Sequence, residues 1–238
     1  MSPKSRCILA ALVGLDGCAT ATPPAATPPT APPTTLRALY RLPRVEHLER
    51  ERSALLLVDF QDEFVHGRLA IGDAPVAIAR AAELLAWARA NRLTVVHVRN
   101  VTKPGALLFA PEASTTAIVP ELAPRADELV LEKPTGGAFT KTALDAELRS
   151  RGIDTLVIAG IMAHLALAMS AQDATVLGYR VLVAEDATTT RDLPTVDGAT
   201  LKRASLAAIG DRFADVLPTR EIRSLPITTF VSPPNLHH

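Results

Sequence analysis

The sequence predicts an α/β fold in which a parallel sheet is covered by helices on both faces. Short apolar runs without polar alternation recur at 54–58, 94–98, 129–131, 155–159, 179–184 and 214–217. Segments with a helical pattern separate most of them, at 75–91, 139–151, 163–178 and 199–213. Continuous apolar strands are buried on both faces, and their alternation with helices is typical of parallel sheets with right-handed crossovers.

Several boundaries of these elements are marked by single residues. Asp73 and Pro75 fit the start of the first helix, and Gly152 and Gly178 fit the ends of two others. The connection from residue 100 to residue 127 is long for a compact domain, so we expect it to shape or cover a site. The stretch 224–238 contains three prolines and is expected to lie over the surface or to fray.

Composition excludes several classes of function. The formal net charge is zero, so nothing indicates a nucleic-acid partner. The two cysteines, Cys7 and Cys18, both precede the predicted domain, which excludes a disulfide, a cysteine metal site or a cysteine nucleophile within it. No glycine-rich phosphate loop, G-x-S-x-G elbow or Asp-x-His pair is present, so we predict neither a cofactor nor a metal.

The first 18 residues have the features of an export signal. Lys4 and Arg6 precede a short apolar run that is too short to span a bilayer. The segment Leu15-Asp16-Gly17-Cys18 resembles a bacterial lipoprotein signal, in which Cys18 is lipidated. Asp16 is unusual in that motif, so ordinary signal cleavage remains an alternative, as does a cytosolic tail with a chance cysteine.

Residues 19–35 form a linker of alanine, threonine and six prolines, which favours an extended polyproline II conformation. The predicted organisation is therefore a signal peptide with a possible lipobox (1–18), a linker (19–35), a domain (36–223) and a C-terminal tail (224–238). We expect an exported periplasmic or cell-envelope lipoprotein that meets the membrane only through its lipid anchor.

Three features are expected to meet at the carboxyl edge of the sheet, where α/β proteins bind ligands. Asp59 ends one strand, Lys133 ends another, and the helix near Ala163 begins after a third. We predict that Asp59 and Lys133 form a hydrogen-bonded pair suited to acid–base work. The structural alternatives are a capping aspartate and a surface lysine. His97 is predicted to be a satisfied core residue and His66 a loop residue.

The chain resembles a known family in ALLLVDFQDEF around Asp59, EKPTGGAF around Lys133 and GIDTLVIAGIMAHLALAMSAQDATVLGYRVLVAEDATTTRDLP. These segments are similar to the isochorismatase-like hydrolases, also called the cysteine hydrolase superfamily. The resemblance covers about residues 53–217. It implies a three-layer, Rossmann-like α/β/α sandwich with a six-stranded, mostly parallel sheet, and a homo-oligomer.

In amide-cleaving members of that family, an aspartate, a lysine and a cysteine form a triad. Asp59 and Lys133 match the first two, whereas Ala166 stands at the cysteine position of G-x-x-T-x-x-C and Ala163 at the threonine position. The resemblance implies a cis bond between Met162 and Ala163, beside an oxyanion hole. The matching positions expected to bind substrate are Gln61, Phe64, Phe139, Met162, Ala163 and His164, and GGAF is expected to widen the pocket near Phe139. His164 is expected to face the site or a neighbouring subunit.

Two functions follow from this pattern. True isochorismatases also lack the cysteine and protonate a vinyl ether with the aspartate, and they carry an Ala-His pair like Ala163-His164. The first expectation is therefore an isochorismatase-like hydrolase that acts on a small molecule with Asp59 as general acid/base. The alternative is an inactive pseudoenzyme that binds a small molecule or a protein partner in the cell envelope. A deliberate substitution at Ala166 is a third explanation, which the second change at Ala163 disfavours.

Overall fold

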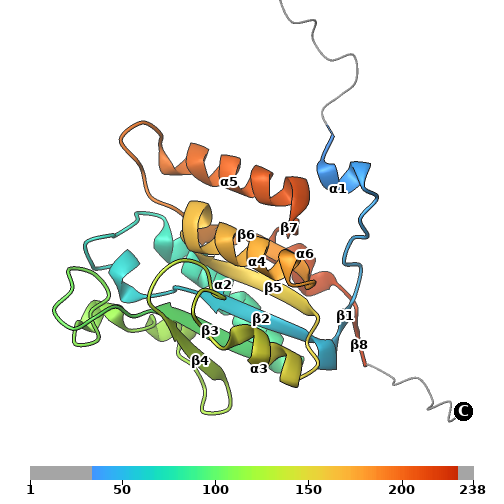
Figure 1. Cartoon of the computed structure of the whole chain (residues 1–238), viewed down its shortest axis with the longest axis horizontal. Helices are drawn as coiled ribbons and strands as arrows, with labels where there is room; N and C mark the ends of the chain where they lie inside the picture. The colour runs from blue at the N-terminus through green and yellow to red at the C-terminus, as the bar shows by residue number, and fades with distance from the viewer. Residues whose placement is uncertain (1–33, 230–238) are drawn as a thin grey trace, which may run out of the picture. The chain divides into compact units, whose positions relative to one another are not determined.

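Six strands, all paired in parallel, form the central sheet in the order β4-β3-β2-β5-β6-β7 (Figure 1). The computed structural model describes residues 34–229. The sheet strands are β2 (Ser53–Val58), β3 (Thr94–Asn100), β4 (Leu129–Lys133), β5 (Thr155–Ile161), β6 (Arg180–Thr189) and β7 (Asp215–Leu217). The predicted six-stranded parallel sheet is confirmed.

Helices cover both faces of the sheet, as the sequence predicts. One face is covered by α2 (Ala74–Ala90) and α6 (Thr219–Ser224), and the other by α3 (Leu144–Ser150), α4 (Ala168–Val176) and α5 (Gly198–Arg212) (Figure 1). Short 3-10 turns lie at Arg50–Arg52, Asp62–Phe64, Ser114–Thr116 and Pro120–Leu122. The result is a three-layer α/β/α sandwich.

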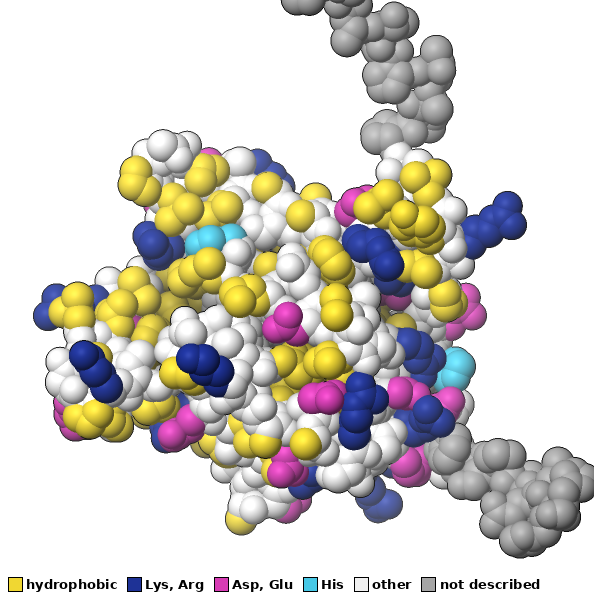
Figure 2. Space-filling view, viewed as in Figure 1, with side chains coloured by type: hydrophobic (Ala, Val, Ile, Leu, Met, Phe, Trp, Pro, Cys, Tyr) yellow, Lys and Arg dark blue, Asp and Glu magenta, His cyan; other side chains and the backbone are white. Residues whose placement is uncertain are grey.

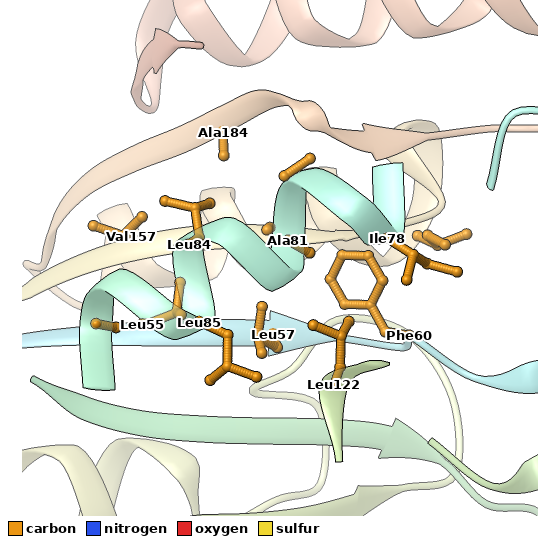
Figure 3. Close-up of a cluster of buried hydrophobic side chains, with 14 of the residues drawn as sticks. Leu55, Leu57, Phe60, Ile78, Ala81, Leu84, Leu85, Leu122, Val157 and Ala184 are labelled. Carbon is orange, nitrogen blue, oxygen red and sulfur yellow. The ribbon is translucent and has the colours of Figure 1, made fainter. Parts of the chain in front are cut away.

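Alternate residues of the central strands serve two separate cores. Leu55 and Leu57 of β2 pack with α2 residues such as Leu84, as Figure 3 shows. Leu56 and Val58 of the same strand pack in the opposite core, toward α3 and α4. Because neighbouring side chains of a strand point to opposite faces, a strand buried on both faces needs apolar residues at every position.

Two predicted helices differ from the observed ones. The helix expected from Phe139 begins at Leu144, because Lys141 has a left-handed φ of 55°, which a right-handed helix cannot include. The helix expected from Ala163 starts with a π-helical turn, Ala163–Leu167, before α4. In that turn Leu167 N–H donates to Met162 C=O at 3.3 Å.

The N- and C-terminal segments of the described chain meet beside the sheet. Strand β1 (Leu48–Glu49) pairs in parallel with β8 (Ile227–Thr228), which lies inside the segment predicted to be a tail. A short helix, α1 (Leu36–Leu39), precedes β1 and is capped by the Thr35 side chain. Among residues 34–229, no helix is long and apolar enough to cross a membrane. The predicted signal peptide and most of the linker lie outside the described residues.

Candidate active site

Asp59 follows β2 directly, at the carboxyl edge of the sheet. Its backbone has a positive φ of 56°, a left-handed conformation that aspartate tolerates better than most residues. The N–H of Asp59 donates to Val98 C=O at 2.8 Å, and its C=O accepts from Gln61 N–H at 2.9 Å. This sharp turn ends the strand, and Asp59 is only 3% exposed.

Lys133 is the last residue of β4, which β3 separates from β2. Its side chain is 1% exposed and reaches the end of β2, where Nζ lies 2.7 Å from Oδ2 of Asp59. The backbone of Lys133 is held by Val101 N–H, which donates to its C=O at 2.9 Å. The predicted pairing of the two side chains is confirmed.

Burial raises the pKa of Asp59 to about 6, and the Lys133 ammonium offsets part of the rise. The second carboxylate oxygen, Oδ1, is buried and has no hydrogen-bond partner among the described residues. A buried carboxylate oxygen normally has a partner, so an exception marks a site of strain or chemistry. This carboxyl can therefore exchange a proton close to neutral pH.

Ala166 stands at the position where the family resemblance places the cysteine of the triad. Ala163 and Ala166 both lie in the π-helical turn after β5, where they are 0% and 6% exposed. The turn is fixed by Ser170, whose hydroxyl donates to Ala166 C=O at 2.5 Å and accepts from Ala138 N–H at 2.8 Å. A methyl group at 166 provides no nucleophile. The cis peptide bond joins Ile161 to Met162, so the prediction of a cis bond between Met162 and Ala163 is wrong by one residue.

The Gln61 side chain makes three hydrogen bonds to the backbone. Nε2 donates to Asn100 C=O at 2.9 Å and to Thr116 C=O at 2.8 Å, while Oε1 accepts from Asn100 N–H at 2.7 Å. These bonds tie the end of β3 and the long connection to the segment after Asp59. Gln61 thus positions the walls of the site, and both of its N–H donors are used in doing so.

Both aromatic residues predicted to bind substrate pack within the protein. Phe64 is buried against Phe109, with ring centroids 5.7 Å apart, in the α2-side core. Phe139 packs on Tyr179, at 5.9 Å, and Tyr179 precedes the amino end of β6. The adjacent Gly137 does not widen a pocket, because a Cβ there would lie 2.9 Å from Cβ of Met169.

His164 and Met162 lie on either side of Ala163 and are both partly buried. His164 Nδ1 is within hydrogen-bond distance of Thr190 Oγ1, at 2.5 Å. Burial, together with the charge of Arg191, lowers the pKa of His164. Met162 packs on the α2-side core. The contribution of Thr190 was missed from the sequence, although it lies in the quoted segment DATTTRDLP.

The long connection borders the site, as predicted. Ala117 C=O accepts from Asp62 N–H at 3.0 Å, and Val119 N–H donates to Phe60 C=O at 3.0 Å. Within residues 34–229, no group of three His, Cys, Asp or Glu side chains is arranged to hold a metal ion. The ionisable side chains that the described residues bring together here are the Asp59 carboxyl and the Lys133 ammonium.

The Isochorismatase domain model matches residues 53–221. The chain belongs to the isochorismatase family. It is 35% identical over 170 residues to the secreted isochorismatase effector Isc1 of Verticillium dahliae, covering 71% of this chain and 90% of that protein. It is 34% identical to a streptothricin hydrolase of Streptomyces noursei over 188 residues, which cover 76% of this chain and 66% of that one.

Solved structures of the isochorismatase family share the fold. An isochorismatase from Pseudomonas putida matches with a TM-score of 0.73 and 30% identity, covering 79% of this chain and 98% of that one. N-carbamoylsarcosine amidase from Thermoplasma acidophilum matches with a TM-score of 0.60 and 31% identity, covering 71% and 96%. Residues 34–52, with α1 and β1, precede the family match.

Proposed function

We propose that this protein is a hydrolase of a small molecule that uses Asp59 as general acid/base and no thiol nucleophile. The observation that carries the proposal is the Asp59 carboxyl itself. One oxygen is held by Lys133, the other has no partner among the described residues, and the pKa is raised to about 6. A general acid works best when its pKa lies near the working pH.

The substrate class that suits this site is an enol ether. Asp59 transfers its proton to the terminal carbon of the double bond, and water adds to the resulting oxocarbenium carbon. The added water returns a proton to Asp59, and the hemiketal collapses to a ketone and an alcohol. Lys133 stabilises the carboxylate that forms after the first proton transfer. No step requires a nucleophile at position 166.

Amide hydrolysis fits the site less well. Two relatives are named as a streptothricin hydrolase and an N-carbamoylsarcosine amidase. In the amide-cleaving members that the sequence resembles, a cysteine occupies the position of Ala166. The relative named an isochorismatase effector supports the enol-ether class instead.

The alternative is a binding protein without turnover. Ala163 and Ala166 favour it, and so does the near-complete burial of Asp59 and Lys133. In that case the protein binds a small molecule or a protein partner in the cell envelope and does not convert it. A homo-oligomer, predicted from the family resemblance, fits either function.

A turnover screen of the full chain with isochorismate and small amides tests the proposal. We expect cleavage of isochorismate, with kcat/KM falling as the pH rises through about 6 because the acid must carry its proton. Asp59→Asn should lower kcat/KM by roughly 100-fold or more. Asp62→Asn, which removes a partly exposed carboxylate paired with His66, is the matched control and should retain activity. Absence of turnover, together with thermal stabilisation by the same compounds, favours the binding protein.

We also propose that the chain is exported and that Cys18 carries the lipid. The word "secreted" in the name of the Verticillium dahliae relative supports export, and the leader composition supports lipidation. Cys18→Ser should move the protein from the membrane fraction to the soluble fraction of expressing cells. An unchanged membrane fraction contradicts lipidation.

A further inference from the structure

A cavity of about 800 Å³ lies between the segment 34–45, here termed the N-terminal strap, and the outer side of α5 and β7. The strap precedes the part of the chain that matches the isochorismatase family, so the family fold alone does not build this cavity. Its volume lies within the range of small-molecule sites, about 300–1,000 Å³. Neither Asp59 nor Lys133 lines it.

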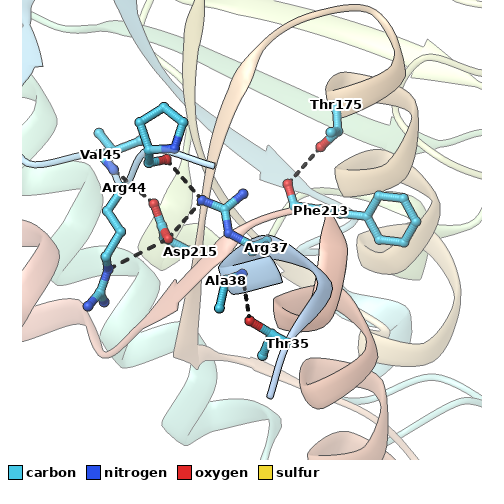
Figure 4. Close-up of polar contacts among 9 residues, drawn as sticks. Thr35, Arg37, Ala38, Arg44, Val45, Thr175, Phe213 and Asp215 are labelled. Atoms are coloured by element: carbon cyan, nitrogen blue, oxygen red, sulfur yellow. Dashed lines mark hydrogen bonds and ion pairs between the residues drawn. The ribbon is translucent and has the colours of Figure 1, made fainter. Parts of the chain in front are cut away.

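The strap is anchored by polar contacts that Figure 4 shows around Asp215. The Arg37 guanidinium donates to Oδ1 of Asp215 at 2.9 Å, and Val45 N–H donates to Oδ2 at 2.9 Å. Leu36 N–H donates to Asp211 of α5 at 2.9 Å. Hydrogen bonds therefore hold both ends of the strap on the folded domain. The strap is thus a fixed wall of the cavity.

The charges that line the cavity are mostly positive. Four arginines and two acidic residues contribute to its walls: Arg37, Arg41, Arg44, Arg203, Glu185 and Asp215. Asp215 is neutralised by Arg37 and lies 3.8 Å from Arg44. The Arg41 guanidinium has no hydrogen bond or ion pair with any described residue. Arg203 donates one hydrogen bond, to the Thr200 hydroxyl at 3.0 Å, and its charge also acts on Asp197 without an ion-pair contact among the described residues. Two guanidinium groups from different elements are thus available to an anion.

Apart from Thr35, the remaining lining is apolar. Leu42 of the strap, Leu206 and Ala207 of α5, and Ala214 and Val216 beside them contribute hydrophobic surface. Exposed hydrophobic side chains continue this surface over α1, next to basic side chains, as Figure 2 shows. They are Leu36, Leu39 and Tyr40, with exposures of 39%, 64% and 63%. Apolar walls with a few convergent charged groups are typical of ligand sites.

We infer that this cavity binds an amphipathic anion, a molecule with a linear apolar chain and a carboxylate or phosphate head. Arg41 and Arg203 hold the head, because the guanidinium fork matches the oxygens of both groups. Leu206, Ala207 and Val216 accommodate the chain. The inference does not depend on the reaction at Asp59, so either can fail without the other.

Titration calorimetry of the full chain with monomeric dodecanoate tests this inference. We expect saturable binding with one molecule per chain, and no comparable binding of dodecyltrimethylammonium. Arg41→Ala and Arg203→Ala should each weaken binding by roughly tenfold, the loss of one charge-assisted hydrogen bond. Arg220→Ala on α6, which removes a side chain that is 85% exposed and outside the cavity, is the matched control.

A second variant, Ala207→Glu, places an acid in the lining without removing an arginine and should also abolish dodecanoate binding. Equal binding of the cationic detergent overturns the inference, as does undiminished binding by the Arg41→Ala/Arg203→Ala double variant. Sedimentation with phosphatidylglycerol vesicles without saturable dodecanoate binding also overturns it, because it assigns the surface to a membrane. Circular dichroism confirms that each variant is folded.

Discussion

A carboxylate lies near each end of β4, and the two differ in how many of their oxygens are hydrogen-bonded. At its carboxyl end, Lys133 contacts one oxygen of Asp59 and the other oxygen has no partner among the described residues. Just before its amino end, both oxygens of Glu128 are bonded: Arg89 donates to each, at 2.7 and 2.9 Å, and Arg125 N–H and His97 reach Oε2 at 3.0 and 2.9 Å.

The pKa values follow this difference. Burial dominates at Asp59 and raises its pKa to about 6. Burial acts in the same direction at Glu128, but the hydrogen bonds from Arg89, Arg125 and His97 outweigh it and lower the pKa to about 2. A carboxylate whose two oxygens are both hydrogen-bonded stabilises the fold, whereas a buried carboxylate with one unbonded oxygen is a candidate for proton transfer.

The largest expected effect comes from Lys133→Met, which leaves Asp59 as an unpaired buried charge. We expect the free energy of unfolding to fall by about 3 kcal/mol near pH ~8, as when one partner of a buried ion pair is removed. The loss should be smaller near pH ~5, because the raised pKa of Asp59 lets it bind a proton in the folded state. Urea unfolding at both pH values measures this.

The control is the Lys133→Met/Asp59→Asn double variant, in which no buried charge remains. It should be more stable than Lys133→Met alone near pH ~8, by the logic of a double-mutant cycle. Equal or lower stability of the double variant contradicts the assignment of the loss to the Asp59 charge.

Glu128→Gln is expected to cost about 2 kcal/mol of stability, because it replaces charge-assisted hydrogen bonds with weaker ones. The lowered pKa of Glu128 means that its contribution is present above the unfolded pKa and is lost as the pH falls toward about 2. The variant should therefore lose less stability than the wild type between about pH 7 and pH 3. Denaturant titrations across this range measure the difference.

Glu132→Gln is the matched control for Glu128→Gln, since Glu132 is half-exposed and contacts Arg99 in the same strand pair. It should change stability little. Glu128→Gln should leave turnover intact, because Glu128 lies at the opposite edge of the sheet from Asp59. Loss of turnover in this variant, with the fold intact, contradicts the conclusion that Glu128 serves stability and Asp59 serves the reaction.

The smallest expected effect is a shift in the reactivity of a cysteine introduced as Ala166→Cys. The helix dipole at the start of α4 should lower the thiol pKa below the free value of ~8.5. Iodoacetamide should then alkylate it at about pH 6.5 faster than the unfolded chain. Ala171→Cys, buried further along α4, is the control and should react more slowly. Equal rates at the two positions contradict the proposed geometry of the site.

The sequence alone predicts the strands well, because burial on both faces imposes unbroken apolar runs that are visible locally. It also predicts the Asp59–Lys133 pair, since both residues end parallel strands and the carboxyl ends of such strands share one edge. The absence of a thiol in the domain is a fact of composition. The roles of Gln61, Phe64 and Phe139 could not be assigned in this way, because an amide or a ring in a loop can face a ligand or the interior.

Contacts between distant segments were decided only by the tertiary structure. Arg37 meets Asp215, and Leu48 pairs with Ile227, across most of the chain length. Neither segment has a periodic pattern of its own, so its conformation depends on the surface it packs against. Local sequence determined the sheet, the Asp59–Lys133 pair and the absence of a cysteine from residues 36–223 of this protein. The strap, its cavity and the free oxygen of Asp59 arise from packing, because each depends on which partner reaches a group from far along the chain.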